Sequence, residues 1–110
     1  MNIDKELQKG HFVIGKCTKC GKKVWPPMDF CDECFGEVIM EDGPQTGRIT
    51  EFAKKENEYF CIIEMTEEIR IMGKLLSGTP KNNQLVKITQ CGIVENNYFF
   101  EFSLLESANM

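Results

Sequence analysis

The sequence predicts a mainly β chain made of a small metal-binding ribbon followed by a five-stranded barrel. Two observations carry this prediction: four cysteines in two Cys-x-x-Cys pairs near the N-terminus, and five short apolar segments with turn residues between them from residue 47 onward. The chain has 110 residues, enough for one domain or for a small module joined to a small domain. We therefore expect a short helix in residues 1–10, a zinc ribbon in residues 11–40 and a barrel in residues 41–110.

The N-terminal segment has the pattern of a short amphipathic helix over residues 2–9. Ile3 and Leu7 share one side of it, and Gly10 suits its C-terminal end. Because so short a helix is marginal in water, it needs an apolar surface on which to pack. His11 is the only histidine in the sequence, and we interpret it as a surface or half-buried side chain rather than as a metal ligand or acid–base group.

Four cysteines match the ligand pattern of a tetrahedral structural zinc site: Cys17, Cys20, Cys31 and Cys34. Gly21 fits the positive φ that the turn after a second cysteine often needs. Paired sites of this spacing are seldom two disulfides or idle thiols. Four thiolates also bind iron, as in rubredoxin, so the ligands alone do not decide the metal. Since all four ligands come from the protein, no position is open for substrate, and the metal is predicted to be structural.

Two short strands are predicted beside the cysteine pairs, at residues 12–15 and 23–25, and Pro26 with Pro27 ends the second. Residues 36–46 contain two glycines and a proline. We place the boundary between ribbon and barrel in that segment.

Apolar side chains gather around the metal-binding sequence, among them Trp25, Phe30 and Phe35. They form either a small core packed over the metal or an exposed patch for a ligand or partner. A ribbon this small cannot bury all of them itself, so some must pack on the barrel or on another molecule.

The remaining sequence has the periodicity of five strands, which we expect at residues 47–53, 59–65, 68–75, 85–89 and 98–104. The first alternates imperfectly, which indicates a β-bulge; the second is apolar on both faces, and the third alternates cleanly. Asn57 closes one turn, and Asn96 with Asn97 suits a tight hairpin. This pattern predicts a small closed barrel such as the OB-fold, although an SH3-like barrel has similar periodicity.

Charge and composition argue against several classes of function. The net charge is −4, and residues 35–110 carry seven Lys or Arg against twelve acids. A nucleic-acid-binding domain normally has a basic excess, so single-strand binding, which ribbons and OB barrels perform elsewhere, is the weaker alternative. No apolar run is long enough to span a membrane and the N-terminus is too polar for a signal peptide. We expect a cytoplasmic protein with reduced cysteines, in which Cys61 and Cys91 are small buried hydrophobes.

The sequence resembles the DUF35 family, whose members combine a rubredoxin-like zinc ribbon with an OB-fold and are associated with acyl-CoA. The resemblance covers roughly residues 11–102. It departs from many relatives at Met28, where they have Arg, and at Gln84, where they have Gly. The residues that carry it are the four cysteines with Gly21, Trp25-Pro26-Pro27, and the segments 47–52, 62–65 and 69–73.

The resemblance implies an accessory subunit beside thiolase-superfamily enzymes, similar to the archaeal protein that bridges acetoacetyl-CoA thiolase and HMG-CoA synthase. It implies structural zinc, and CoA or an acyl-CoA as ligand. The sequence itself has no Ser/His/Asp set, no catalytic-looking Cys–His pair and no Gly-rich phosphate loop, so we expect no enzyme activity. An electron carrier with iron at the thiolates is a third alternative.

A geometric mechanism follows from this resemblance. The pantetheine arm of CoA would lie in an apolar groove between ribbon and barrel, lined by Trp25, Phe30 and Phe35. Cationic side chains would meet the CoA phosphates; the candidates are Arg48, Arg70, Lys22 and Lys23.

Overall fold

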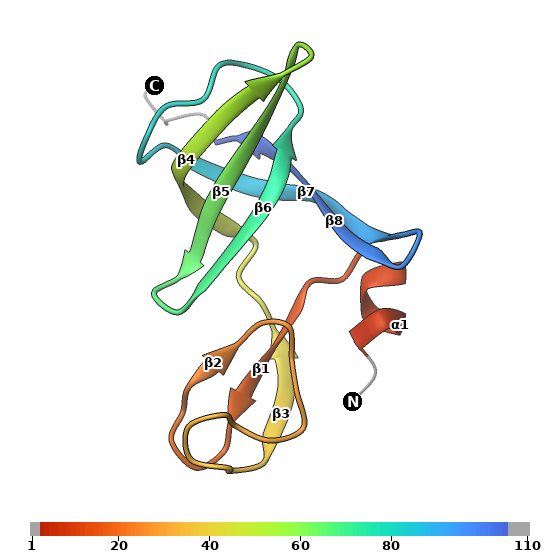
Figure 1. The fold of residues 1–110 in the computed structure, drawn as a ribbon, viewed down its shortest axis with the longest axis vertical. Coiled ribbons are helices and arrows are strands. Elements are labelled where there is room, and N and C mark those ends of the chain that lie inside the picture. Colours follow the sequence, from red (N-terminus) through yellow and green to blue (C-terminus); the bar gives the residue numbers. More distant parts are fainter. Residues whose placement is uncertain (1–2, 106–110) are drawn as a thin grey trace.

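The computed structural model describes residues 3–105 and contains a three-stranded ribbon, a five-stranded barrel and one short helix (Figure 1). The helix α1 spans Ile3–Gln8. The ribbon strands are β1 (Val13–Cys17), β2 (Lys23–Val24) and β3 (Val38–Asp42). The barrel strands are β4 (Thr46–Lys55), β5 (Glu58–Thr66), β6 (Ile69–Leu75), β7 (Leu85–Val94) and β8 (Asn97–Leu104). The mainly β architecture predicted from the sequence is confirmed.

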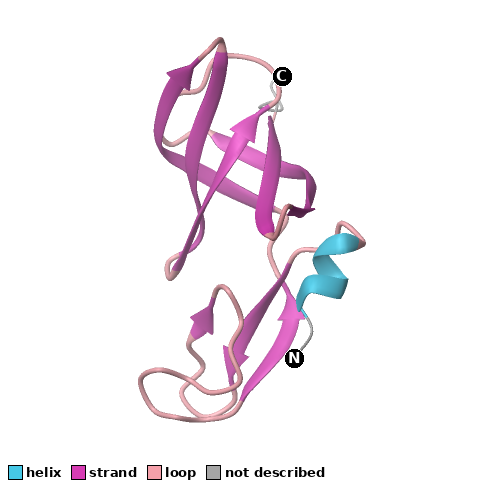
Figure 2. Cartoon of the chain, turned by 45° about the vertical axis from the view of Figure 1, so that its right-hand side comes forward, coloured by secondary structure: helices cyan, strands magenta, loops and turns pink. Residues whose placement is uncertain are grey.

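The barrel closes in the order β4-β5-β6-β8-β7, with β4 also paired to β7. Its strand pairs are antiparallel except for β6 and β8, which run parallel. The chain therefore crosses over between the third and fifth barrel strands, as in the five-stranded Greek-key barrel of the OB-fold. Figure 2 shows the barrel and the ribbon stacked along the long axis of the molecule, with α1 beside their junction.

The local irregularities of the barrel follow the expected pattern with one extension. The bulge in β4 falls between Ile49 and Glu51, as the imperfect alternation predicts. Strand β7 reaches Val94 rather than residue 89, because its second half continues to pair with β8. The hairpin turn has positive φ at Glu95 and Asn96, one residue earlier than predicted.

The third ribbon strand was not predicted. Strand β3 lies inside the segment expected to be the boundary, and it pairs with β1 from Val38 opposite Cys17 to Asp42 opposite Val13. Glycines and a proline flank this strand instead of interrupting it, so the composition of residues 36–46 hid it. At Gly15 the ribbon packs so closely that an added Cβ would lie 2.7 Å from the Val38 side chain.

One hydrophobic core runs through the helix, the ribbon and the barrel. Leu7 of α1, Phe12 and Ile14 of the ribbon side, and Ile63 and Phe102 of the barrel belong to the same cluster of buried side chains. A second, smaller cluster beside the metal-binding sequence contains Cys17, Val24, Cys31 and Val38. The ribbon is therefore packed onto the barrel and is not tethered by a linker alone.

The short helix has the apolar surface that it requires. Ile3 and Leu7 are buried, as predicted, and α1 packs against β7 and β1. Tyr98 Oη donates a hydrogen bond to Asp4 Oδ1 at 3.3 Å. Residue 2, included in the predicted helix, lies outside the described residues. Within residues 3–105 no helix is long and apolar enough to cross a membrane.

His11 ties the end of the helix to the end of β3. Its Nδ1 lies 2.8 Å from Glu6 Oε1 and its Nε2 lies 2.7 Å from Asp42 Oδ1. Only the protonated imidazolium can donate to both carboxylates. The hydrogen bonds with Glu6 and then with Asp42 accordingly raise the pKa of His11 above its ordinary value.

This geometry predicts that stability falls as the pH rises through the folded-state pKa of His11. A raised folded pKa means that the stabilisation is complete below the unfolded pKa of about 6.5 and disappears above the folded value. Thermal unfolding of the zinc-loaded protein at about pH 6 and about pH 8.5 measures this effect. The melting temperature of the wild type should drop more over this interval than that of His11→Gln. Equal drops in the two proteins would contradict the assignment.

Candidate metal centre and adjoining surfaces

The four predicted cysteines converge at one point of the ribbon. Their sulfur atoms all lie within 4.8 Å of one another, with Cys17 and Cys34 Sγ 3.4 Å apart and Cys20 and Cys31 Sγ 3.7 Å apart. A tetrahedral zinc ion with Zn–S bonds of about 2.3 Å requires sulfur–sulfur separations of about 3.8 Å. The residues present therefore fit a four-thiolate metal centre.

Each half of this centre is a turn that directs backbone N–H groups at sulfur. The N–H groups of Lys19 and Cys20 donate to Cys17 Sγ, and that of Glu33 donates to Cys31 Sγ. The Gly36 N–H donates to Cys34 Sγ at 3.4 Å. Such bonds stabilise thiolates, which are the form that binds metal.

The pKa values of Cys17 and Cys20 are shifted in opposite directions. The N–H groups of Cys20 and Lys19 lower the pKa of Cys17 to about 6. The Lys22 N–H lowers the pKa of Cys20, but the neighbouring Cys34 sulfur, burial and the other thiols outweigh it and raise the pKa to about 12. A metal ion must displace the remaining protons, so binding releases protons and weakens in acid.

The two turns have the same backbone path but different residues. The Gly21 N–H donates to the Cys17 carbonyl at 3.0 Å, and the Phe35 N–H donates to the Cys31 carbonyl at 3.0 Å. Both residues have positive φ, 80° for Gly21 and 61° for Phe35. The sequence predicted this conformation for Gly21; nothing in the residue type of Phe35 predicted it.

Sequence reasoning also missed Gly36. A Cβ at this position would lie 2.7 Å from Cys17 Sγ and 3.2 Å from Cys34 Sγ, so only glycine lets the backbone pass this close to the sulfurs. The available signal was a glycine two residues after the last cysteine, at the place where a backbone N–H must reach the metal site.

The aromatic residues predicted to line one groove occupy different environments. Trp25 is half-buried at the junction, with ring centroids 5.1 Å from Phe12, 5.5 Å from Tyr98 and 5.6 Å from Phe100. The Phe30 and Phe35 side chains are 61% and 79% exposed. Phe35 follows Cys34 directly and donates its backbone N–H to the Cys31 carbonyl, so it lies beside the metal-binding cysteines. Trp25 thus packs on the barrel junction rather than over the metal, and Phe30 and Phe35 fit the exposed-patch interpretation.

The predicted cationic residues are all ion-paired. Arg48 and Arg70 both pair with Glu64. Lys22 pairs with Asp32 and Glu33, and Lys23 lies 3.9 Å from Glu41. Strand register places Arg48, Glu64 and Arg70 in one row across β4, β5 and β6.

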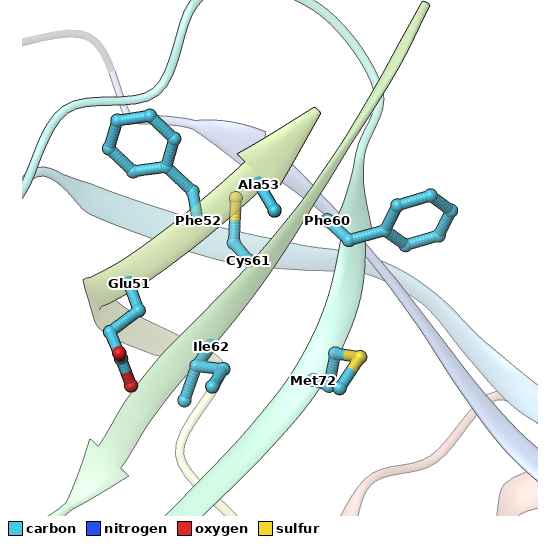
Figure 3. A pocket seen from close by; sticks show the side chains of 7 residues that line it. All are labelled: Glu51, Phe52, Ala53, Phe60, Cys61, Ile62 and Met72. Carbon is cyan, nitrogen blue, oxygen red and sulfur yellow. The ribbon is translucent and has the colours of Figure 1, made fainter. Parts of the chain in front are cut away.

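The neighbouring rows on this barrel face are mostly apolar, with one charged residue each. Glu51, Ile62 and Met72 form the next row, and Ala53, Phe60 and Lys74 form the one after it. All of these except Lys74 line a shallow depression of about 250 Å³ in which Glu51 is the charged lining residue (Figure 3). A second depression of about 290 Å³ adjoins it across Phe60 and Met72. The predicted strand with apolar residues on both faces was the signal for this surface.

The ribbon sequence matches a known family. Residues 4–40 match the family model described as ChsH2, rubredoxin-like zinc ribbon domain. This segment is similar to the ChsH2-type zinc ribbon. Comparison with curated proteins finds no match.

Solved structures extend the similarity of the ChsH2-type ribbon to the whole fold. The structure of an "Ltp2-ChsH2(DUF35) aldolase" aligns with a TM-score of 0.74 and 16% identity, over 92% of this chain and 90% of that one. A protein of unknown function from the DUF35 family of Sulfolobus solfataricus aligns with a TM-score of 0.64 and 16% identity, over 92% and 81%. At this identity the matches establish the fold. Together with the ribbon match, they confirm the resemblance to DUF35 proteins.

Proposed function

We propose that this chain is a non-catalytic subunit that docks on a thiolase-superfamily enzyme and helps to hold a CoA thioester there. The observation that carries the proposal is the arrangement of the four cysteines, whose sulfurs lie within 4.8 Å of one another and would fill all four positions of a tetrahedral metal ion. Zinc held by these residues supplies folding free energy to the ribbon rather than an activated water. An aldolase assembly that contains a chain of this fold supports the partner role.

Other reactive groups among residues 3–105 also favour a role without chemistry. His11 is held between two carboxylates. Cys61 and Cys91 are buried, and burial raises the pKa of both thiols. A nucleophile requires an accessible thiolate or an adjacent base, and neither thiol meets this requirement.

For the CoA thioester we propose the barrel face of β4, β5 and β6. Its apolar rows at Phe60, Ile62 and Met72 suit the pantetheine arm, and Arg48 and Arg70 at the next row suit the phosphates. Both arginines must then exchange part of their pairing with Glu64 for the ligand. Trp25 is committed to the junction, which leaves Phe30 and Phe35 for contacts with a protein.

Single-strand binding has less support on this same face. Single-strand binding combines base stacking on aromatic residues with a positively charged groove that follows the phosphate backbone. Here Glu64 pairs with both Arg48 and Arg70, and Glu58 pairs with Lys74. The face carries interleaved acids rather than a basic groove.

Affinity purification tests the partner role. The tagged chain should co-purify from its host's lysate with a thiolase-fold enzyme, identified by mass spectrometry against a tag-only control.

Calorimetry with acetyl-CoA tests the ligand role. Met72→Asp should weaken binding at least about tenfold, because it places a charge among the apolar side chains of this face. Val94→Asp, a similarly exposed apolar residue at the β7–β8 tip, is the matched control. Absence of such an enzyme contradicts the docking proposal, and equal affinities contradict the CoA site.

A further inference from the structure

Phe35 has a backbone conformation that its side chain does not favour. Its φ is 61°, and it is the only aromatic residue with positive φ in residues 3–105. The left-handed region costs an ordinary L-residue roughly 1–2 kcal/mol relative to glycine. The equivalent position of the other turn, Gly21, shows the residue that the backbone alone would select.

Burial of the Phe35 side chain does not offset this strain, because the side chain is mostly exposed. Its exposed fraction of 79% is the highest among the large exposed hydrophobic residues of the described chain. A strained backbone that holds an apolar side chain in solvent is typical of a functional position. Aromatic residues of this kind are enriched among the side chains that dominate protein–protein binding energy.

The exposed apolar residues and the charges of the ribbon indicate which kind of partner Phe35 would bind. Phe30 and Ile39 are further exposed apolar residues of the ribbon, and they line a depression of about 480 Å³ beside β3. The segment 29–37 contains four carboxylates and no lysine or arginine. Lys22 neutralises part of Asp32 and Glu33.

The ribbon as a whole is also negative. Residues 11–42 contain four lysines and six carboxylates, and four thiolates on one divalent ion add about two further negative charges. This charge disfavours nucleic acid, anionic lipid and a second copy of the chain as occupants. It favours a protein surface with positive charge around an apolar pocket.

We propose that Phe35 inserts into an apolar pocket of a partner enzyme whose rim carries arginine or lysine, and that Phe30 and the carboxylates of the same segment, residues 29–37, contribute to the interface. This inference rests on the proposed function and deepens it by naming the docking surface. Phe35 then lowers the stability of the free subunit and raises its affinity for the partner enzyme.

The stability half of this inference needs no partner. Phe35→Gly in the zinc-loaded chain should raise the melting temperature by roughly 2–5 °C, because it removes the left-handed strain. Gly21→Ala is the converse control and should lower the melting temperature. A Phe35→Gly protein less stable than the wild type would show that Phe35 is a structural residue and would overturn the inference.

The binding half uses the enzyme that co-purifies with the wild-type chain, expressed and purified on its own. Phe35→Gly and Phe35→Asn should each weaken binding by about thirtyfold or more, the effect of losing a dominant interface residue. Asn tolerates the left-handed conformation, so weaker binding by the Phe35→Asn variant does not result from a folding defect. Wild-type binding should also weaken as salt rises.

The outcomes separate the two levels of the proposal. If the wild type binds the enzyme and both Phe35 variants bind equally well, the docking surface is wrong and the proposed function stands. If the wild type binds no enzyme, both the docking surface and the proposed docking function are wrong. Binding that is lost in the variants but insensitive to salt overturns the basic rim.

Discussion

Cys31→Ser is expected to release the metal and unfold the cysteine-bearing part of the ribbon, residues 17–38, while the junction at Phe12 and the barrel remain folded. The serine hydroxyl does not replace a thiolate ligand, and structural zinc supplies about 10–16 kcal/mol of apparent folding free energy in small zinc modules. The ribbon's own cluster offers little in its place, since it buries only Val24 and Val38 beside two of the cysteines. Burial of two valines contributes about 3–6 kcal/mol, far below the entropy lost in ordering residues 17–38.

Elemental analysis and amide NMR spectra measure this outcome. Zinc should fall well below one ion per chain, and the amides of residues 17–38 should move to random-coil positions while barrel amides stay dispersed. Cys61→Ala is the matched control, because it removes a buried thiol from the barrel core and should retain zinc. A Cys31→Ser protein with full metal content and an unchanged spectrum would refute the metal centre.

Phe12→Ala should cause the largest loss of stability away from the metal. Phe12 is fully buried at the junction, where its ring lies 5.1 Å from Trp25 and 5.5 Å from Phe100, centroid to centroid. Gly43 packs against it so closely that an added Cβ would lie 2.5 Å from the Phe12 ring. Truncation of such a side chain costs about 3–5 kcal/mol.

Denaturant unfolding of the zinc-loaded protein measures this loss. Phe52→Ala, at a half-exposed aromatic residue of the barrel surface, is the control and should cost less than about 1 kcal/mol. A small loss for Phe12→Ala would mean that ribbon and barrel are stabilised independently. The expected large loss supports a single unit in which the barrel positions the ribbon.

The features that the sequence predicted well are those encoded over short distances. The four metal ligands follow from two local spacings, and the turn at Gly21 follows from its residue type. The bulge in β4 and the buried face of β6 follow from periodicity of two. In each case the residues that decide the structure are neighbours in the chain.

The features that it missed depend on contacts between distant residues. Strand β3 exists because it pairs with β1, about 25 residues earlier. Trp25, Phe30 and Phe35 are close in sequence, yet the chain carries Trp25 to the barrel and Phe35 to the metal end. The second partner of His11 was likewise hidden, since Asp42 is 31 residues away.

Sedimentation velocity of the chain mixed with its co-purified enzyme tests the central claim most directly, which is that a closed four-cysteine metal site shapes a surface for partner binding. The chain is measured twice, loaded with zinc and stripped by a chelator. We predict that the loaded chain sediments with the enzyme and that the stripped chain sediments alone, because the ribbon surface requires the metal. A stripped chain that binds as well as the loaded one, or a loaded chain that sediments alone, would contradict it.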